Sequence, residues 1–148
     1  TNFGTTTVAT ASTRRQLYAA VFSSVSGTFA ADEEINQAST GAVGKVVEYD
    51  ATNKLLYWYQ TRFPDVGTDA NGNATAFSGA NAITGQTSSA SATPNTSSST
   101  DVNGVSITSG YSNPELAADS GDIIYVEERS PITRASDQTE NIKLIIEF

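Results

Sequence analysis

Acidic side chains stand close enough for chemistry at two places in the sequence. Glu127 and Glu128 are adjacent on a predicted strand. Alternation along a strand sends their side chains to opposite faces, so they cannot act as the paired carboxylates of a glycosidase. The acidic run over 32–34 offers a cation site, although a solvated turn explains it more simply. Neither place predicts a catalytic centre.

Asp69, Asn71 and Asn73 alternate like the first ligands of a calcium loop. Such a loop needs glycine at its sixth position and a bidentate glutamate at its twelfth. Here glycine stands at 72 instead, and position 80 is Ala80. The pattern therefore does not predict a calcium site.

The composition removes the usual catalytic and metal-binding groups. The chain has no histidine and no cysteine, so it lacks the general base that titrates near neutral pH, any thiolate, and the commonest zinc ligands. No glycine-rich phosphate loop or nucleophile elbow is present. We therefore predict a protein that is not an enzyme and that needs no cofactor or metal.

The net charge and the length of the chain limit the classes of partner that it can bind. Eight basic and 16 acidic residues give a formal charge of -8, which opposes nucleic acid because phosphate contacts need a basic surface. No apolar run is long enough to span a bilayer. With 148 residues, one domain is expected, and neither a membrane nor a small-molecule substrate is expected as a partner.

Hydrophobic patterns predict strands in the first half. The segment 44–60 is predicted to be a hairpin turning over 50–53, and its second strand is apolar on both faces, which is typical of a central or covered strand. A strand is also expected over 14–25, and a short strand ending near Ile35.

Residues 67–104 are rich in Ser, Thr, Ala and Asn and offer few side chains to bury. Such a stretch cannot offset roughly 1–2 kcal/mol of ordering entropy per residue, so a long flexible surface loop is predicted. Because so long a loop is uncommon in a compact domain, order on another subunit is the alternative.

The end of the chain predicts further strands over 105–108, 122–128 and 142–148. The fold class expected is mainly β, an antiparallel β-sandwich or small barrel with a long Ser/Thr/Asn-rich loop. Its parts are an extended arm (1–13), a hairpin-rich part (14–66), a flexible low-complexity loop (67–104) and C-terminal strands that complete the same domain (105–148).

The connector between the last two strands is dense in polar groups. Arg129 and Arg134 flank Pro131, and their guanidinium groups can bind Asp137 and Glu140 through paired hydrogen bonds. Such a network either clamps the connector within the chain or contacts a neighbouring subunit.

The same ending resembles a known family. The ordered residues are Ser120-Gly121, Ile124-Tyr125, Glu127, Arg129, Pro131-Ile132, Asp137-Gln138-Thr139-Glu140, Ile142 and Phe148. Over 112–148 this string is similar to the C-terminal end of the baseplate wedge protein, the gene-eight product, of T-even-like contractile-tailed phages, including cyanophage relatives. It departs from that pattern at Glu128, where asparagine is usual.

The resemblance implies a structural virion protein in the tail baseplate, assembled in the host cytoplasm. It also implies binding to other wedge subunits and pairing with a second copy as a homodimer. Family members are longer, and the sequence lacks methionine, so we expect a piece of a larger subunit.

Aromatic residues dominate interface energetics, which makes Tyr57, Trp58 and Tyr59 candidate interface anchors, with ordinary core packing as the alternative. Two other functions stay open. One is a receptor- or glycan-binding module of the tail that uses the Trp58 region and the polar loop. The other is a tail, neck or capsid decoration protein.

Overall fold

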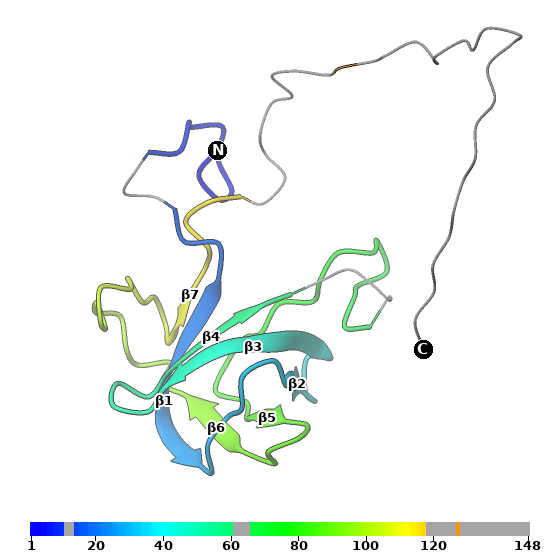
Figure 1. Cartoon of the computed structure of the whole chain (residues 1–148), viewed down its shortest axis with the longest axis vertical. Helices are drawn as coiled ribbons and strands as arrows, with labels where there is room; N and C mark the ends of the chain where they lie inside the picture. The colour runs from blue at the N-terminus through cyan, green and yellow to red at the C-terminus, as the bar shows by residue number, and fades with distance from the viewer. Residues whose placement is uncertain (11–13, 61–65, 118–126, 128–148) are drawn as a thin grey trace, which may run out of the picture.

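The computed structural model describes residues 1–10, 14–60, 66–117 and 127 (Figure 1). Its strands form one antiparallel seven-stranded sheet, which confirms a mainly-β fold. The strands are β1 (Tyr18–Ser26), β2 (Glu34–Gln37), β3 (Ala42–Asp50), β4 (Leu55–Tyr59), β5 (Ile83–Gly85), β6 (Ser91–Pro94) and β7 (Tyr111–Ser112).

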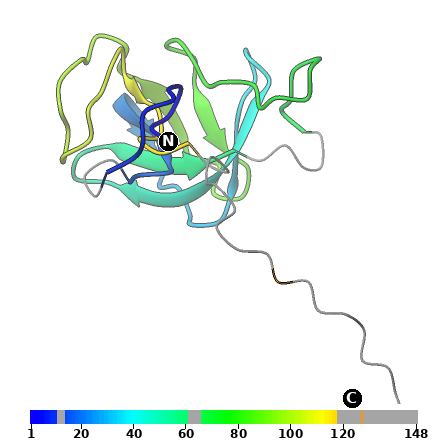
Figure 2. The ribbon, with the colours of Figure 1, turned by 90° about the horizontal axis from the view of Figure 1, so that it is seen from above.

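The sheet closes on itself through β1. The neighbours run in the order β4-β3-β2-β5-β6-β1-β7, and β1 also pairs with β4. The first half of β1 pairs with β4, and its second half pairs with β6 across a bulge between Phe22 and Ser24. One long strand thus serves two neighbours in succession, and the result is a small barrel (Figure 2).

The hairpin β3–β4 is the longest pairing and lies where the sequence predicts it. In its turn, the Asp50 Oδ1 accepts hydrogen bonds from the backbone N–H groups of Thr52 and Asn53, at 2.9 and 3.1 Å. A bulge between Val46 and Glu48 interrupts the register. Such a bulge adds the local twist and bend that a closing strand needs.

Aromatic side chains fill the barrel interior. Trp58 is 1% exposed and lies between two rings, stacked on Tyr18 at 6.0 Å and edge-to-face with Phe77 at 5.1 Å. A Cβ at Gly44 would lie 2.7 Å from Trp58 Cδ1, so β3 needs glycine where the indole crosses its backbone. The interior cluster consists of Ala20, Phe22, Phe29, Ile35, Ala42, Val46, Leu56, Trp58, Phe77, Ile83, Ala90 and Ala92.

A second cluster covers part of the outside of β1 and β4. Ala19 and Leu55 point away from the interior, and both are fully buried beneath Val105 and Ile107. The chain between β6 and β7 therefore acts as a cover for these two strands. This explains why β4 is apolar on both faces.

The stretch 67–104, predicted to be a long flexible loop, contains two strands, β5 and β6, so it is not a loop throughout. Ile83, Ala90 and Ala92 supply the apolar groups that these strands bury. In the sequence they are isolated among Ser, Thr, Asn and Gly residues, so they form no recognisable strand pattern. The chain on either side of this hairpin runs over opposite sides of the barrel, 66–82 on one and 96–110 on the other (Figure 1).

Two other predicted segments also differ from the structure. Residues 105–108 form isolated bridges, Val102 with Val105 and Thr108 with Tyr111, instead of a strand. The start of the predicted extended arm folds back, with Asn2 N–H bonded to the Thr7 carbonyl at 2.8 Å. Predicted strands 122–128 and 142–148 lie outside the described residues apart from Glu127, which is not in a strand.

The described chain contains no helix with the length and hydropathy needed to cross a membrane.

Candidate assembly surface

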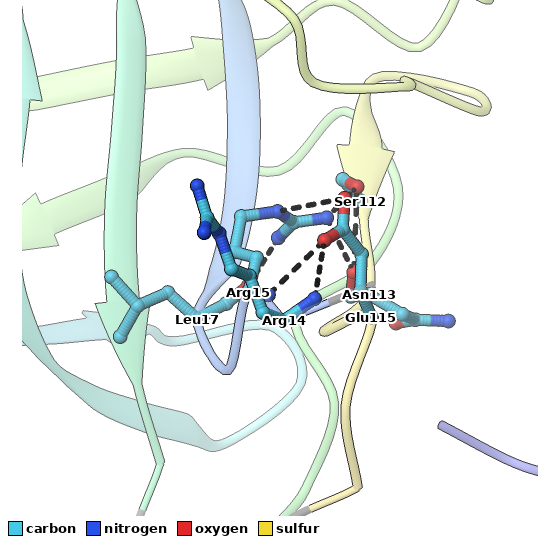
Figure 3. A network of polar contacts seen from close by, with 6 residues as sticks. All are labelled: Arg14, Arg15, Leu17, Ser112, Asn113 and Glu115. Atoms are coloured by element: carbon cyan, nitrogen blue, oxygen red, sulfur yellow. Dashed lines mark hydrogen bonds and ion pairs between the residues drawn. The ribbon is translucent and has the colours of Figure 1, made fainter. Parts of the chain in front are cut away.

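A polar junction ties the start of β1 to the residues after β7. Figure 3 shows the group, in which Arg15 lies at the centre. Its Nη2 donates to the Ser112 Oγ and to the Asn113 carbonyl, both at 2.7 Å, and its Nη1 donates to the Leu17 carbonyl. The guanidinium therefore binds both the segment that leads into β1 and the segment that leaves β7.

Glu115 completes the polar junction from the other side. Its Oε2 accepts the backbone N–H groups of Arg14 and Arg15 at 3.2 and 3.1 Å, and its Oε1 lies 3.9 Å from Arg15 Nε. Its own N–H donates to the Arg15 carbonyl at 2.7 Å. The contacts join positions about a hundred residues apart, and no short-range pattern in the sequence predicts them.

Burial lowers the pKa of Arg15 from its ordinary value, and the nearby Glu115 carboxylate opposes that shift. An arginine side chain titrates so far above neutral pH that it stays charged, and the contact remains a charge-assisted one. The polar junction is therefore held together by a charged guanidinium and is part of the fold.

The three aromatic candidates on β4 have different surroundings. Trp58 is 1% exposed and belongs to the interior cluster, which fits the alternative of ordinary core packing. Tyr57 is half-buried against the outer cluster, and Tyr59 is 37% exposed. Alternation along β4 explains the difference, because Trp58 faces inward while its two neighbours face outward.

An outer apolar face lies beside Tyr59. It comprises Leu17, Val47, Tyr57 and Tyr59, on or next to β1, β3 and β4. Val47 is 40% exposed at the bulge of β3, and Leu17 points away from the polar junction (Figure 3). The described residues leave this face partly open, whereas they cover the adjoining face around Leu55.

Of the remaining predicted site residues, the structure describes Glu127 alone. Glu127 is exposed. Arg129, Pro131, Arg134, Asp137, Gln138 and Glu140 lie outside the described residues.

The acidic run has a structural role that sequence reasoning missed. Glu33 is only 5% exposed, which contradicts a solvated turn. Its Oε2 accepts the N–H groups of Thr87 and Ser88 at 3.1 and 2.9 Å, and its Oε1 accepts Ala30 N–H at 2.7 Å and Ser88 Oγ–H at 2.8 Å. Burial alone would raise the pKa of Glu33, but these hydrogen bonds outweigh it and hold the pKa below 4.5. The carboxylate thus clamps the connection between β5 and β6.

Asp69 shows why the calcium pattern fails. Its Oδ1 accepts the backbone N–H groups of Asn71 and Asn73, at 2.8 and 2.9 Å, so the carboxylate closes its own turn. Among residues 1–10, 14–60, 66–117 and 127, no group of three acidic side chains is placed to hold a metal ion.

A comparison with protein families decides the identity. A family model described as "Bacteriophage T4, Gp8" matches residues 58–148. The chain belongs to this phage Gp8 family. Searches of curated proteins and of solved structures found no match.

Membership confirms the resemblance seen in the sequence, since the T4 gene 8 product is a baseplate wedge protein. The chain is therefore a structural protein of the phage tail baseplate. The region matched to Gp8 begins inside β4, so its strands β5 and β6 pair with β1 and β2 from the unmatched part. The polar junction adds a second connection between the two parts.

Proposed function

We propose that this chain is a subunit of the baseplate wedge and acts by binding its neighbours through protein interfaces. The partners are other wedge subunits and a second copy of the chain, with which it forms a homodimer. Assembly takes place in the host cytoplasm. The mechanism is burial of surface between subunits, and it involves no catalytic residue or cofactor.

The closure of the barrel supports this proposal. Among the described residues, every strand pairing that closes the ring lies between Tyr18 and Pro94, so the ring closes with these strands alone. Yet the match to Gp8 extends to residue 148. We therefore assign the connector over 127–140 to contacts with neighbouring wedge subunits.

The connector carries the residues suited to such contacts. Arg129 and Arg134 can each bind a carboxylate on a partner through two parallel hydrogen bonds. Arginine is enriched among the residues that dominate interface energies, where truncation often costs at least about 2 kcal/mol.

A binding experiment tests the assignment. Arg129→Ala and Arg134→Ala variants are combined with purified wedge subunits, and affinity is measured by calorimetry or by co-purification. Loss of roughly 2 kcal/mol corresponds to a decrease of about thirtyfold in affinity. The control is Arg14→Ala, which removes an exposed arginine on the barrel. Wild-type affinity for both connector variants, with unchanged thermal stability, would reject the connector as the contact.

The homodimer needs its own measurement. Light scattering during gel filtration over a dilution series reports the mass of the chain in solution. A mass that falls from dimer to monomer on dilution supports pairing with a second copy. A monomer mass at every concentration contradicts the homodimer but leaves the binding of other wedge subunits untouched.

A further inference from the structure

We propose that the last predicted strand, residues 142–148, packs on the outer apolar face of its own chain, formed by Leu17, Val47, Tyr57 and Tyr59. This inference rests on the proposed function and deepens it. An end anchored on the barrel makes the preceding connector a closed loop that is presented to neighbouring subunits.

The adjoining outside of the barrel supplies the first argument. There, Ala19 and Leu55 are fully buried because Val105 and Ile107, two residues apart in the sequence, cover them. The outer apolar face continues the same side of β1 and β4. Tyr18 pairs with Trp58, and one further step in this register sets Leu17 beside Tyr59. One half of a continuous surface is thus covered, and the described residues leave the other half partly open.

The amino-acid pattern of the last seven residues matches the open half. Ile142, Leu144, Ile146 and Phe148 alternate with Lys143, Ile145 and Glu147, which gives an extended segment one continuous apolar face and one mixed face. Side chains two residues apart lie roughly 7 Å apart, and the open half spans two strand spacings, roughly 10 Å. Two or three of these side chains are enough to cover it.

The closed barrel supplies the second argument. Its interior is filled by the aromatic and aliphatic cluster, and its ring of pairings is complete. An apolar strand that follows β7 therefore has no place inside the barrel and needs an outer surface.

The path of the chain is compatible with this position. Leu116 N–H donates to the Arg15 carbonyl at 3.1 Å, so the residues after β7 pass beside the start of β1, next to Leu17. Residues 118–141 follow, and a chain of that length reaches on the order of 80 Å when extended. The segment can reach the face with enough slack for the connector to project.

Disulfide trapping tests the proposal in the full chain, which has no cysteine of its own. Val47→Cys is combined with Leu144→Cys in one variant and with Ile146→Cys in another, so that two registers of the segment are sampled. Val47 is 40% exposed, so its replacement leaves the interior intact. After mild oxidation, free thiols are counted and non-reducing gels separate monomer from dimer.

We expect near-complete loss of free thiols in at least one of these variants, with the product running as a monomer. Two controls should keep their thiols. Val47→Cys with Lys143→Cys tests the face of the segment, and Val8→Cys with Leu144→Cys tests random collisions, since Val8 is 78% exposed on the N-terminal segment.

Each other result overturns the proposal. A disulfide-linked dimer would show that a second copy occupies the face. Equal trapping in the controls would show collisions without a fixed site, and retained thiols in every variant would show that the segment lies elsewhere. None of these results depends on wedge subunits, so failure here is separable from failure of the proposed function.

Discussion

The two hairpins β3–β4 and β5–β6 lie in the same barrel but are stabilised differently. In β3–β4, apolar side chains are buried on both faces, with Leu56 inside and Leu55 beneath the outer cover. The connection of β5–β6 depends on the buried carboxylate of Glu33. The β3–β4 hairpin, called the apolar hairpin below, is thus stabilised by buried apolar area. The β5–β6 hairpin, called the polar hairpin, combines a few apolar contacts with specific hydrogen bonds.

A second buried polar group supports the polar hairpin from β2, the strand that directly follows Glu33. Gln37 is fully buried. Its Nε2 donates to the Asn81 carbonyl at 2.9 Å, and its Oε1 accepts Ser78 N–H at 2.9 Å. Polar groups on or next to β2 therefore organise the chain on both sides of β5. Buried polar groups require partners, so such a hairpin is specific in geometry but sensitive to single changes.

The largest effect is expected from a cavity in the apolar hairpin. Leu56→Ala removes a fully buried side chain from the interior and should lower the free energy of unfolding by about 2–5 kcal/mol. Urea denaturation followed by circular dichroism measures it. Val8→Ala, at a 78% exposed position, should change the same quantity by less than about 0.5 kcal/mol. Equal losses in both variants would contradict the comparison.

Removing the clamp should have a smaller and more local effect. Glu33→Ala leaves the N–H groups of Thr87 and Ser88 without their acceptor and should cost roughly 1.5–3 kcal/mol. Hydrogen exchange should accelerate at these amides while the amides of β3–β4 stay protected. The matched control is Glu34→Ala, an exposed neighbour on β2. Uniform acceleration across the barrel would show that the two hairpins are not independent.

Adding a side chain next to the Glu33 carboxylate should lower the free energy of unfolding by less than removing the carboxylate does. A Cβ at Gly85 would lie 2.6 Å from both the Glu33 Oε2 and the Ser88 Oγ. Gly85→Ala should therefore destabilise the chain by about 1 kcal/mol, the low end of overpacking costs. In the Glu33→Ala background part of this loss should vanish, because the clashing carboxylate is gone while the Ser88 Oγ remains. Additive losses in the double variant would place the strain elsewhere.

Acidification should destabilise the polar hairpin, and this loss of stability should be smaller than those caused by the substitutions above. The pKa of Glu33 in the folded chain lies below the 4.5 of an ordinary glutamate. Its contribution is therefore fully present above about pH 4.5 and is lost as the pH falls through the folded pKa. The hydrogen bonds that lower the pKa of Asp50 and of Asp69 add their own acid dependence.

A difference measurement isolates the contribution of Glu33. Unfolding free energies of the wild-type chain and of Glu33→Gln are compared from about pH 7 to about pH 3. The wild-type advantage should shrink only below about pH 4.5. A constant difference over the whole range would show that ionisation of Glu33 does not stabilise the fold.

Much of the apolar hairpin could be predicted because its signal is local. Alternating and continuous apolar residues over 44–60 indicate two strands, and the turn residues between them indicate the reversal. The polar hairpin could not be predicted in the same way. Glu33 and Ser88 are far apart in the sequence, and neither residue type distinguishes a buried clamp from a solvated turn.

Some features of the candidate assembly surface could likewise be predicted from the sequence, and others could not. The sequence string from Ser120 to Phe148 resembles the wedge family, and the match over 58–148 confirms this resemblance. The aromatic run on β4 indicated candidate anchors, but the sequence could not say which rings face outward. The polar junction of Arg15 and Glu115 gave no signal at all, because its two partners meet only when β7 is placed beside β1.

The sequence by itself determined the mainly-β class, the β3–β4 hairpin and the family, because each depends on residues close together along the chain. Only the tertiary structure decided that the sheet closes, that Trp58 is buried while Tyr59 is exposed, and that Glu33 and Arg15 are structural groups. These outcomes depend on which distant strands become neighbours. Burial and hydrogen bonding of a polar side chain are set by those neighbours and not by its own type.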